Sequence, residues 1–325
     1  MSGSGLPIVV CNFSEAYTLR GTLGIIRQLC PEALFTFRKD GIFLSRINDG
    51  NDVLVELEIW SSELDMYEMN AYTEDGEEVD QFDVGFSLSE IMKAIKSIGK
   101  KDGVRLYMMP GDSRLYVQLI SSSRKGTETA PINVVPTIKV VREEHVSFSY
   151  SREEDDPNIR ISSTDFAKSC TNMTTMKVSY VTATGFPTGV LFKGFADKNS
   201  IVRVEPFGDV NPQQEPDVIS DDLAKMLDDI RIRSNRSGPI PSLPATATCP
   251  VTPLVSKRLK INVRKQEDLC LVRMKGSLIK ILSKINTICP GGLVKIYIEP
   301  GLPLKLVSGV GSYGRCTFYI RDNTC

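Results

Sequence analysis

The chain has 325 residues, which is long enough for two domains with hydrophobic cores of their own. Its 39 Lys and Arg nearly balance its 40 Asp and Glu, and the net charge of -1 excludes a generally basic nucleic-acid binder but permits positive charge gathered on one surface. No apolar run reaches membrane-spanning length, and the start lacks the basic region and long apolar core of a secretory signal. We therefore expect an intracellular protein.

The sequence also lacks the short motifs of common enzyme and metal chemistry. The eight cysteines include no Cys-x-x-Cys pair, and His145 is the single histidine, so neither a zinc site nor a disulfide framework is expected. There is no GxxxxGKS or GxxxxGKT phosphate loop and no GxSxG elbow. The acidic run from Glu153 to Asp156 is typical of solvated surface. We expect no catalytic residues, no cofactor and no metal.

The first predicted helix runs from Glu15 to Leu29. Its apolar positions recur at helical spacing, and Arg20 and Arg27 lie seven residues apart, so they project from one face. A hairpin with an Asp40-Gly41 turn follows, and Val53 to Trp60 predicts a further strand.

A second helix is predicted from Ser87 to Ile98. Its apolar stripe consists of Leu88, Ile91, Met92, Ile95 and Ile98. Ser87 and Glu90 have the spacing of a capping box, and Gly99 ends the pattern. The opposite face carries Lys93, Lys96 and Lys100. When the segment is taken alone, an ordinary solvated face is the favoured explanation, because lysines normally occupy exposed faces.

The same plan recurs in the second half of the chain. Ser163 to Met173 predicts a helix that carries Lys168, and Lys275 begins another, with Lys280 and Lys284 off its apolar stripe. Strand patterns follow each helix. The sequence therefore predicts an α+β protein made of two similar domains, each with two helices packed on antiparallel sheets.

Composition places the boundaries between these parts. We predict an N-terminal domain at residues 1–141, a polar connector at 142–157 and a C-terminal domain at 158–325. A proline-rich insertion at about 205–257 interrupts the second domain, and the segment SDDLAKMLDDIRI within it has the pattern of a short helix. This insertion is interpreted as a mobile segment, or alternatively as a helix that docks a partner.

The order of elements and four sequence blocks resemble the sliding clamps of the proliferating cell nuclear antigen (PCNA) type. The blocks are DGIFLSRIND, SLSEIMKAIKSIGKKDGVRL, STDFAKSC and LPLKLV with the closing CTFYI. The resemblance implies that three subunits close head to tail into a ring around duplex DNA, with helices lining the hole and sheets outside. It implies a non-enzymatic processivity factor that tethers a DNA polymerase, replication and repair proteins, and is opened by a clamp loader. The expected location is the nucleus or a viral replication compartment.

The resemblance assigns sequence-independent DNA binding to basic residues on the four helices. Phosphate contacts from such residues attract DNA without reading its bases. The expected DNA-binding residues are Arg20, Arg27, Lys93, Lys96, Lys100, Lys168, Lys280 and Lys284. It also implies that an edge near Thr127 to Asn133 meets an edge near Lys193 to Ile201 of the neighbouring subunit.

The resemblance implies a second site, an apolar pocket beside the connector that takes a short peptide with aromatic and aliphatic anchors. Plain core packing is the alternative for each of its residues. The expected partner-binding residues are Ile47, Leu54, Val146, Phe148, Tyr150, Pro303, Tyr319 and Ile320.

The chain departs from the family pattern at this pocket. Asn48 replaces a usual acidic residue, Asp52 replaces a usual apolar one, and RDNTC replaces the usual tail. These departures and the insertion suggest a specialised copy, such as one from a large DNA virus. A non-catalytic structural or scaffold protein of a virus-like assembly is the alternative, but such a protein has no need of four basic helical faces.

Overall fold

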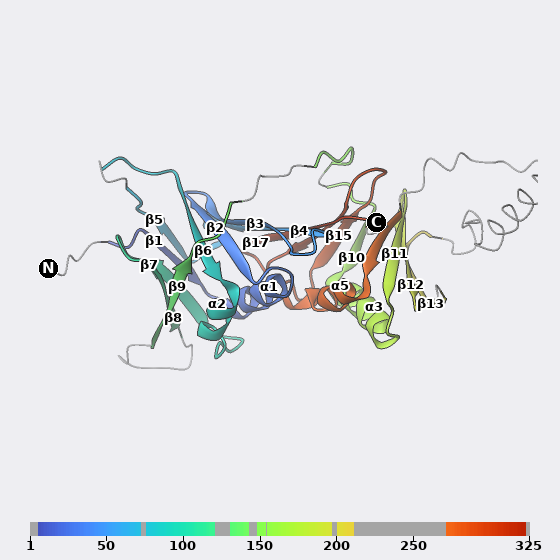
Figure 1. Ribbon diagram of the computed structural model, residues 1–325, viewed down its shortest axis with the longest axis horizontal. Helices are drawn as coiled ribbons and strands as arrows, with labels where there is room; N and C mark the ends of the chain where they lie inside the picture. The colour runs from blue at the N-terminus through green and yellow to red at the C-terminus, as the bar shows by residue number, and fades with distance from the viewer. Residues whose placement is uncertain are drawn as a thin grey trace, which may run out of the picture. The chain divides into compact units, whose positions relative to one another are not determined.

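The computed structural model describes residues 6–72, 76–120, 131–142, 148–153, 155–196, 200–210 and 271–322. These residues all belong to one compact unit with an α+β architecture, in which every strand pairing is antiparallel (Figure 1). The segment SDDLAKMLDDIRI lies outside them. In the described part, no helix is long and apolar enough to cross a membrane.

The first half places two helices among antiparallel strands. Its elements are β1 (Val9–Phe13), α1 (Ala16–Leu29), β2 (Glu32–Arg38), β3 (Gly41–Ile47), β4 (Val53–Trp60), the 3-10 turn η1 (Ser61–Glu63), β5 (Met66–Met69), β6 (Gln81–Ser87), α2 (Leu88–Ala94), β7 (Gly103–Met108), β8 (Arg114–Ile120) and β9 (Ile132–Ile138).

The described residues of the second half follow a similar order of helices and strands, as the sequence predicted, with four strands between the two helices where the first half has five. Its elements are β10 (Ile159–Ser162), α3 (Ser163–Thr175), β11 (Tyr180–Phe186), β12 (Gly189–Phe195), β13 (Ile201–Gly208), β14 (Leu271–Lys275), α5 (Gly276–Leu282), the 3-10 turn η5 (Ile285–Thr287), β15 (Leu293–Tyr297), β16 (Leu304–Gly309) and β17 (Gly314–Ile320).

One sheet runs through both halves because the last strand pairs with a strand of the first half. Strand β17 lies antiparallel to β4 from Gly314 opposite Ile59 to Ile320 opposite Val53. The resulting order is β10-β15-β16-β17-β4-β3-β2-β6-β9-β8-β7-β1-β5, and β13-β12-β11-β14 form a second sheet. This shared sheet does not divide at residues 142–157. The boundary between two domains there stays a prediction.

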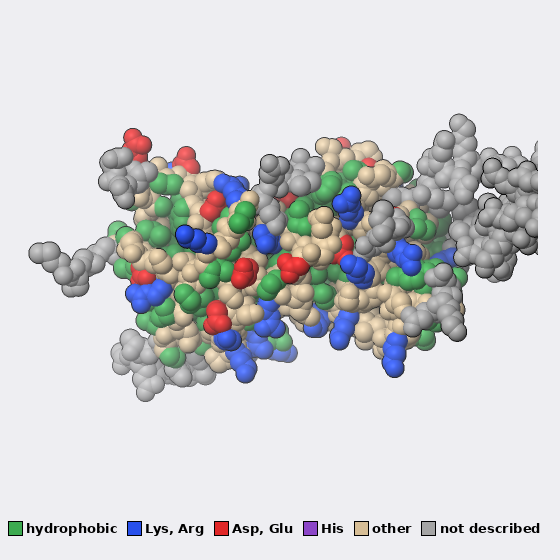
Figure 2. All heavy atoms as spheres, viewed as in Figure 1, with side chains coloured by type: hydrophobic (Ala, Val, Ile, Leu, Met, Phe, Trp, Pro, Cys, Tyr) green, Lys and Arg blue, Asp and Glu red, His purple; other side chains and the backbone are tan. Residues whose placement is uncertain are grey.

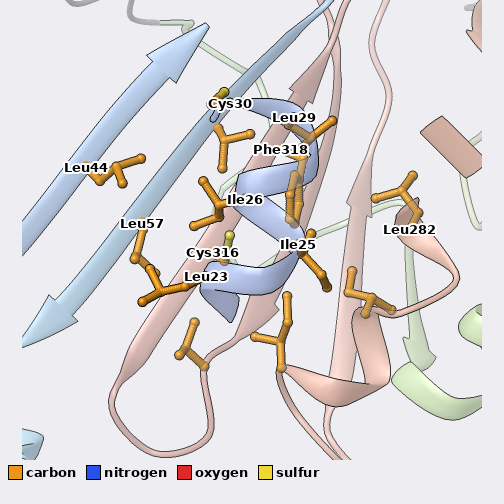
Figure 3. Packing of buried hydrophobic residues seen from close by; sticks show 14 of the residues in the cluster. Leu23, Ile25, Ile26, Leu29, Cys30, Leu44, Leu57, Leu282, Cys316 and Phe318 are labelled. Carbon is orange, nitrogen blue, oxygen red and sulfur yellow. The ribbon is translucent and has the colours of Figure 1, made fainter. Parts of the chain in front are cut away.

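The helices cover one side of the strands and bury their apolar stripes there. Helix α1 buries Leu19, Leu23, Ile26 and Leu29, as its periodicity predicted. Figure 3 shows α1 side chains packed among Leu44 of β3, Leu57 of β4 and Cys316 and Phe318 of β17. A single core therefore includes residues from both halves.

Helix α2 ends earlier than the sequence predicted. Helix α2 stops at Ala94, although Ile95 and Ile98 of the predicted stripe are still buried. The predicted capping box does not form: the Leu88 amide donates to the Pro31 carbonyl (2.9 Å), and Glu90 binds Lys93 instead (2.6 Å).

Two strand assignments also differ from the prediction. Strand β13 continues to Gly208, so residues 205–208 belong to the sheet and not to the predicted insertion. Lys193 lies in β12, which has neighbours on both sides, so the edge expected near Lys193 to Ile201 is formed by β13.

The buried Tyr313, in the turn before β17, ties the second half to the start of α1. Its hydroxyl accepts a hydrogen bond from the Glu15 amide (2.5 Å) and lies 3.1 Å from Ser14 Oγ. Its ring packs edge-on against Phe13, with 5.3 Å between centroids. The hydroxyl thereby satisfies one of the amides that a helix start leaves without an internal partner.

We expect Tyr313→Phe to lower the free energy of unfolding by about 1 kcal/mol, because the part-buried Glu15 amide loses its acceptor while the ring packing stays. Urea denaturation followed by circular dichroism measures this. Tyr107→Phe is the matched control, since Tyr107 stacks on Tyr116 at the surface. Equal stability of the two variants would contradict the role given to the Tyr313 hydroxyl.

Candidate nucleic-acid and partner interfaces

The four α-helices of the described residues lie along one edge of the unit in Figure 1, and Figure 2 shows Lys and Arg side chains gathered on that edge. Each helix buries its apolar face and leaves its polar face outward. The periodicity of the sequence thus places basic side chains from both halves on a common surface.

Seven of the eight basic residues expected to bind DNA are exposed. They are Arg27, Lys93, Lys96, Lys100, Lys168, Lys280 and Lys284. Two of these make side-chain contacts: Lys93 pairs with Glu90 in the same helix, and Lys284 Nζ donates to Gln28 Oε1 of α1 (2.8 Å). Three of the seven lie in turns just beyond the helices and not within them: Lys96 and Lys100 after α2, and Lys284 after α5.

Arg20 is placed differently from the others. It is half-buried, its guanidinium donates to the Ile98 carbonyl (2.9 Å), and it lies over the ring of Tyr17. Its position therefore fastens α1 to the turn after α2. The prediction missed Lys101, which is exposed beside Lys100; the consecutive lysines in GKKDG were the available signal.

The second candidate site is a hollow of about 630 Å³ on the strand side of the chain. It lies where the β3–β4 turn, the connector, the start of β14 and the end of β17 meet. Its lining residues are Ile47, Asn51, Asp52, Val53, Leu54, Phe148, Leu271, Val272, Pro300, Gly301, Leu302, Pro303, Tyr319, Arg321 and Asp322. A concave site with apolar walls and a few polar groups at its rim is typical of a binding pocket.

Most of the residues expected at the partner pocket line this hollow. Ile47, Leu54, Phe148, Pro303 and Tyr319 do so. Tyr150 does not line it, but its ring lies 6.4 Å from the ring of Tyr319. Ile320 does not line the hollow, because it points to the opposite face of β17 and is 1% exposed in the core. Val146 lies outside the described residues. The prediction missed Leu271 and Leu302, which approach from segments with no pocket signature of their own.

Aromatic contacts form one wall of the hollow. The rings of Phe148 and Tyr319 lie 5.2 Å apart, and Tyr150 donates from its hydroxyl to the Pro303 carbonyl (2.7 Å). Lys305 Nζ lies over the rings of Tyr150, Tyr297 and Tyr319 at 5.2, 4.9 and 5.9 Å from their centroids. Cation–π attraction at this point holds the connector against β15, β16 and β17.

Glu299 holds the connector at a second point. Its carboxylate accepts hydrogen bonds from the Ser151 amide (2.9 Å), the Ser151 hydroxyl (3.0 Å) and the Arg152 amide (3.0 Å). Burial alone would raise the pKa of Glu299, but these hydrogen bonds and the charge of Arg152 outweigh it and hold the pKa below its usual value.

The two departures from the family pattern in the β3–β4 turn are partners of each other. Asn48 Nδ2 donates to Asp52 Oδ1 (2.6 Å), and Asn48 Oδ1 accepts from the Asp52 and Val53 amides (3.0 Å each). Asp52 also pairs with Lys275 of β14 (2.7 Å). Asp52, at a position that is usually apolar in the family, therefore adds an ion pair between the two halves at the rim of the hollow.

The chain after β17 is bound at the same rim. The Arg321 amide donates to the Asp52 carbonyl (2.9 Å), and Asp322 Oδ1 accepts from the Arg273 amide (2.9 Å). Both residues line the hollow. The first two residues of the altered tail thus form part of the pocket wall.

Comparison with known proteins identifies the fold. The chain superimposes on proliferating cell nuclear antigen from Entamoeba histolytica with a TM-score of 0.63 at 12% sequence identity, covering 97% of this chain and 99% of that one. No protein-family model matches the sequence, and no curated protein does. The fold is that of a PCNA-type clamp, as the sequence blocks indicated.

The depressed pKa of Glu299 predicts that acid loosens the connector. The carboxylate contributes its hydrogen bonds fully above the ordinary glutamate pKa of 4.5, and they weaken as pH falls through its lower value in the folded protein. Amide hydrogen exchange at residues 148–153, corrected for the intrinsic rate, should show a loss of protection below pH 4.5.

Glu299→Gln should remove this acid-dependent step, because the amide does not titrate. Glu153→Gln, on the same connector, is the control and should keep it. An identical exchange profile in the parent and in Glu299→Gln would show that this carboxylate does not anchor the connector.

Proposed function

We propose that this chain is a subunit of a DNA sliding clamp, a processivity factor that encircles duplex DNA and tethers proteins to it. The observation that carries the proposal is the set of exposed basic residues on α1, α2, α3 and α5 and in the turns after α2 and α5, on one side of a clamp fold. A clamp must hold DNA without stopping at any sequence. Lysine and arginine contacts to phosphates meet that need because they read no bases.

Ring formation requires two different surfaces that fit each other. A contact between unlike surfaces, repeated by threefold rotation, closes a homotrimer. Strands β9 and β13 provide candidate surfaces, since each has a side with no partner along part of its length among the described strands. Three copies in a ring would turn the helices toward the DNA and the strands outward.

Proteins with short clamp-binding peptides would dock in the hollow on the strand side. Its volume of about 630 Å³ suits two or three apolar side chains, and Phe148 and Tyr319 offer them aromatic contacts. The peptide would lie extended across the connector and the end of β17. A DNA polymerase, repair proteins and a clamp loader are the expected partners, in the nucleus or a viral replication compartment.

The clamp is preferred over a structural or scaffold protein because of the charge distribution. A scaffold gives no reason for basic residues on every helix of one side, whereas a clamp requires them. No reaction is proposed for the chain, since tethering needs only binding surfaces.

Lys93→Glu with Lys96→Glu should weaken DNA binding strongly at low salt. The double variant should also reduce the magnitude of the slope of log affinity against log salt by about 1 for each lost phosphate contact, which is up to about 2 for each subunit that contacts the DNA. Folding should be unaffected, because both side chains are exposed. Fluorescence anisotropy with duplex DNA at several salt concentrations measures both quantities.

Lys39→Glu with Lys139→Glu is the matched control. It makes the same change in net charge, but these two exposed lysines lie away from the helices, in the β2–β3 turn and just after β9. If both double variants lose affinity equally, net charge and not the helical surface governs binding, and the proposal fails.

Phe148→Ala and Ile47→Ala should each weaken binding of a clamp-binding peptide by at least about tenfold, because a few buried anchors carry most of the affinity of such contacts. Isothermal titration calorimetry measures this. Tyr72→Ala, at an exposed aromatic residue away from the hollow, should bind like the parent. Unchanged affinity in both hollow variants would remove the hollow from the partner site.

A further inference from the structure

Strands β9 and β13 each have a backbone edge that no described strand covers. From Ile132 to Pro136, β9 pairs only with β8; strand β6 joins it only at Thr137 and Ile138. Among the strands that the structure describes, β13 pairs only with β12. The two strands lie at opposite ends of the unit in Figure 1.

A proline lies on each of these edges, with its nitrogen facing outward. The Thr137 amide donates to Ser113 on the β8 side (2.9 Å), so the backbone groups of Pro136 and Val134 face the other way. Likewise the Asp209 amide donates to Thr188 on the β12 side (3.3 Å), and Pro206, three residues earlier, faces away from β12. Each open edge therefore has a position that accepts a hydrogen bond but cannot donate one.

Apolar side chains are exposed on the same two strands. Ile132 and Val134 of β9 are 48% and 46% exposed, and Ile201 of β13 is 54% exposed. Uncovered edges with exposed β-branched residues attract other strands, and natural proteins limit such edges with proline. On both edges, a stretch with exposed apolar side chains, able to pair with another strand, is followed in the chain by a proline.

We propose that Pro136 and Pro206 set the length and register of a strand pairing between copies of this chain. Residues of β9 before Pro136 pair antiparallel with residues of β13 before Pro206 in the next copy. Antiparallel pairing places the two prolines at opposite ends of the ladder, where each ends it. This inference rests on the proposed ring, and the occupant of each edge is a second copy of the chain.

The arrangement has a consequence for ring strength. A ladder confined between two prolines contains few hydrogen bonds, so apolar contacts of Ile132, Val134 and Ile201 supply much of the attraction. The prolines also keep the edges from pairing in longer, shifted registers that would build open chains of subunits. The strand ladder between two subunits is therefore short, and the subunits separate more readily than if the ladder continued past the prolines.

Proline exchange at the edges tests the proposal. Pro206→Val restores an outward donor and should lower the dissociation constant of each subunit contact about two- to tenfold, as expected for one added hydrogen bond per contact. Val134→Pro removes an outward donor without breaking the β8–β9 ladder and should raise the constant by a similar factor. Sedimentation equilibrium measures association, and thermal melting verifies that each variant is folded.

Pro110→Val is the matched control, because Pro110 lies in the turn between β7 and β8 and on neither edge. A trimeric parent whose association is the same in Pro206→Val and Val134→Pro would overturn the role of the prolines and leave the proposed clamp intact. A parent that stays monomeric at every concentration, with and without DNA, would overturn the ring and this inference together.

Discussion

The pairing of β17 with β4 is the contact on which the rest of the structure depends. It joins the end of the chain to a strand near its beginning and makes one sheet of both halves. The approach is close: a side chain in place of Gly314 would collide with the Glu58 carbonyl. Because this pairing fixes the two halves together, their helices lie on one side, and basic residues far apart in sequence form one surface.

The same contact creates the hollow on the strand side. Leu54 and Tyr319 face each other across the β4–β17 pair, and the connector lies against the strands beyond it. The Asp52–Lys275 ion pair and the tail residues Arg321 and Asp322 complete the rim. Loss of the strand pairing would therefore disrupt the proposed DNA surface and the proposed partner site together.

The sequence predicted a helix well where its buried apolar residues and its helical backbone hydrogen bonds cover the same residues. Helices α1 and α3 follow the apolar period along their whole length. For α2 and α5 the period continues into turns, since Ile95, Ile98 and Ile288 are buried without being helical. Apolar spacing reports which side chains face the core, and it does not report whether the backbone between them stays helical.

The candidate sites differ in how far sequence could predict them. Basic residues on a helix follow from spacing within one segment, so seven of the eight were predicted at exposed positions. The sequence could not distinguish the half-buried Arg20 from the exposed basic residues, because its hydrogen bond to the Ile98 carbonyl joins two separate segments. Tyr319 and Ile320 could not both line a pocket, as neighbours in a strand face opposite sides. Leu271 and the Asn48–Asp52–Lys275 contacts depend on chain segments that only the fold brings together.

The central claim is that the chain forms a closed ring around DNA. The direct measurement assembles dissociated subunits in the presence of a covalently closed DNA circle and then passes the complex through a sizing column at moderate salt. The account predicts that protein stays with the circle, in a ratio of three chains of 36.0 kDa per ring, and is lost once the circle is cut. Equal loss from intact and cut circles would contradict it.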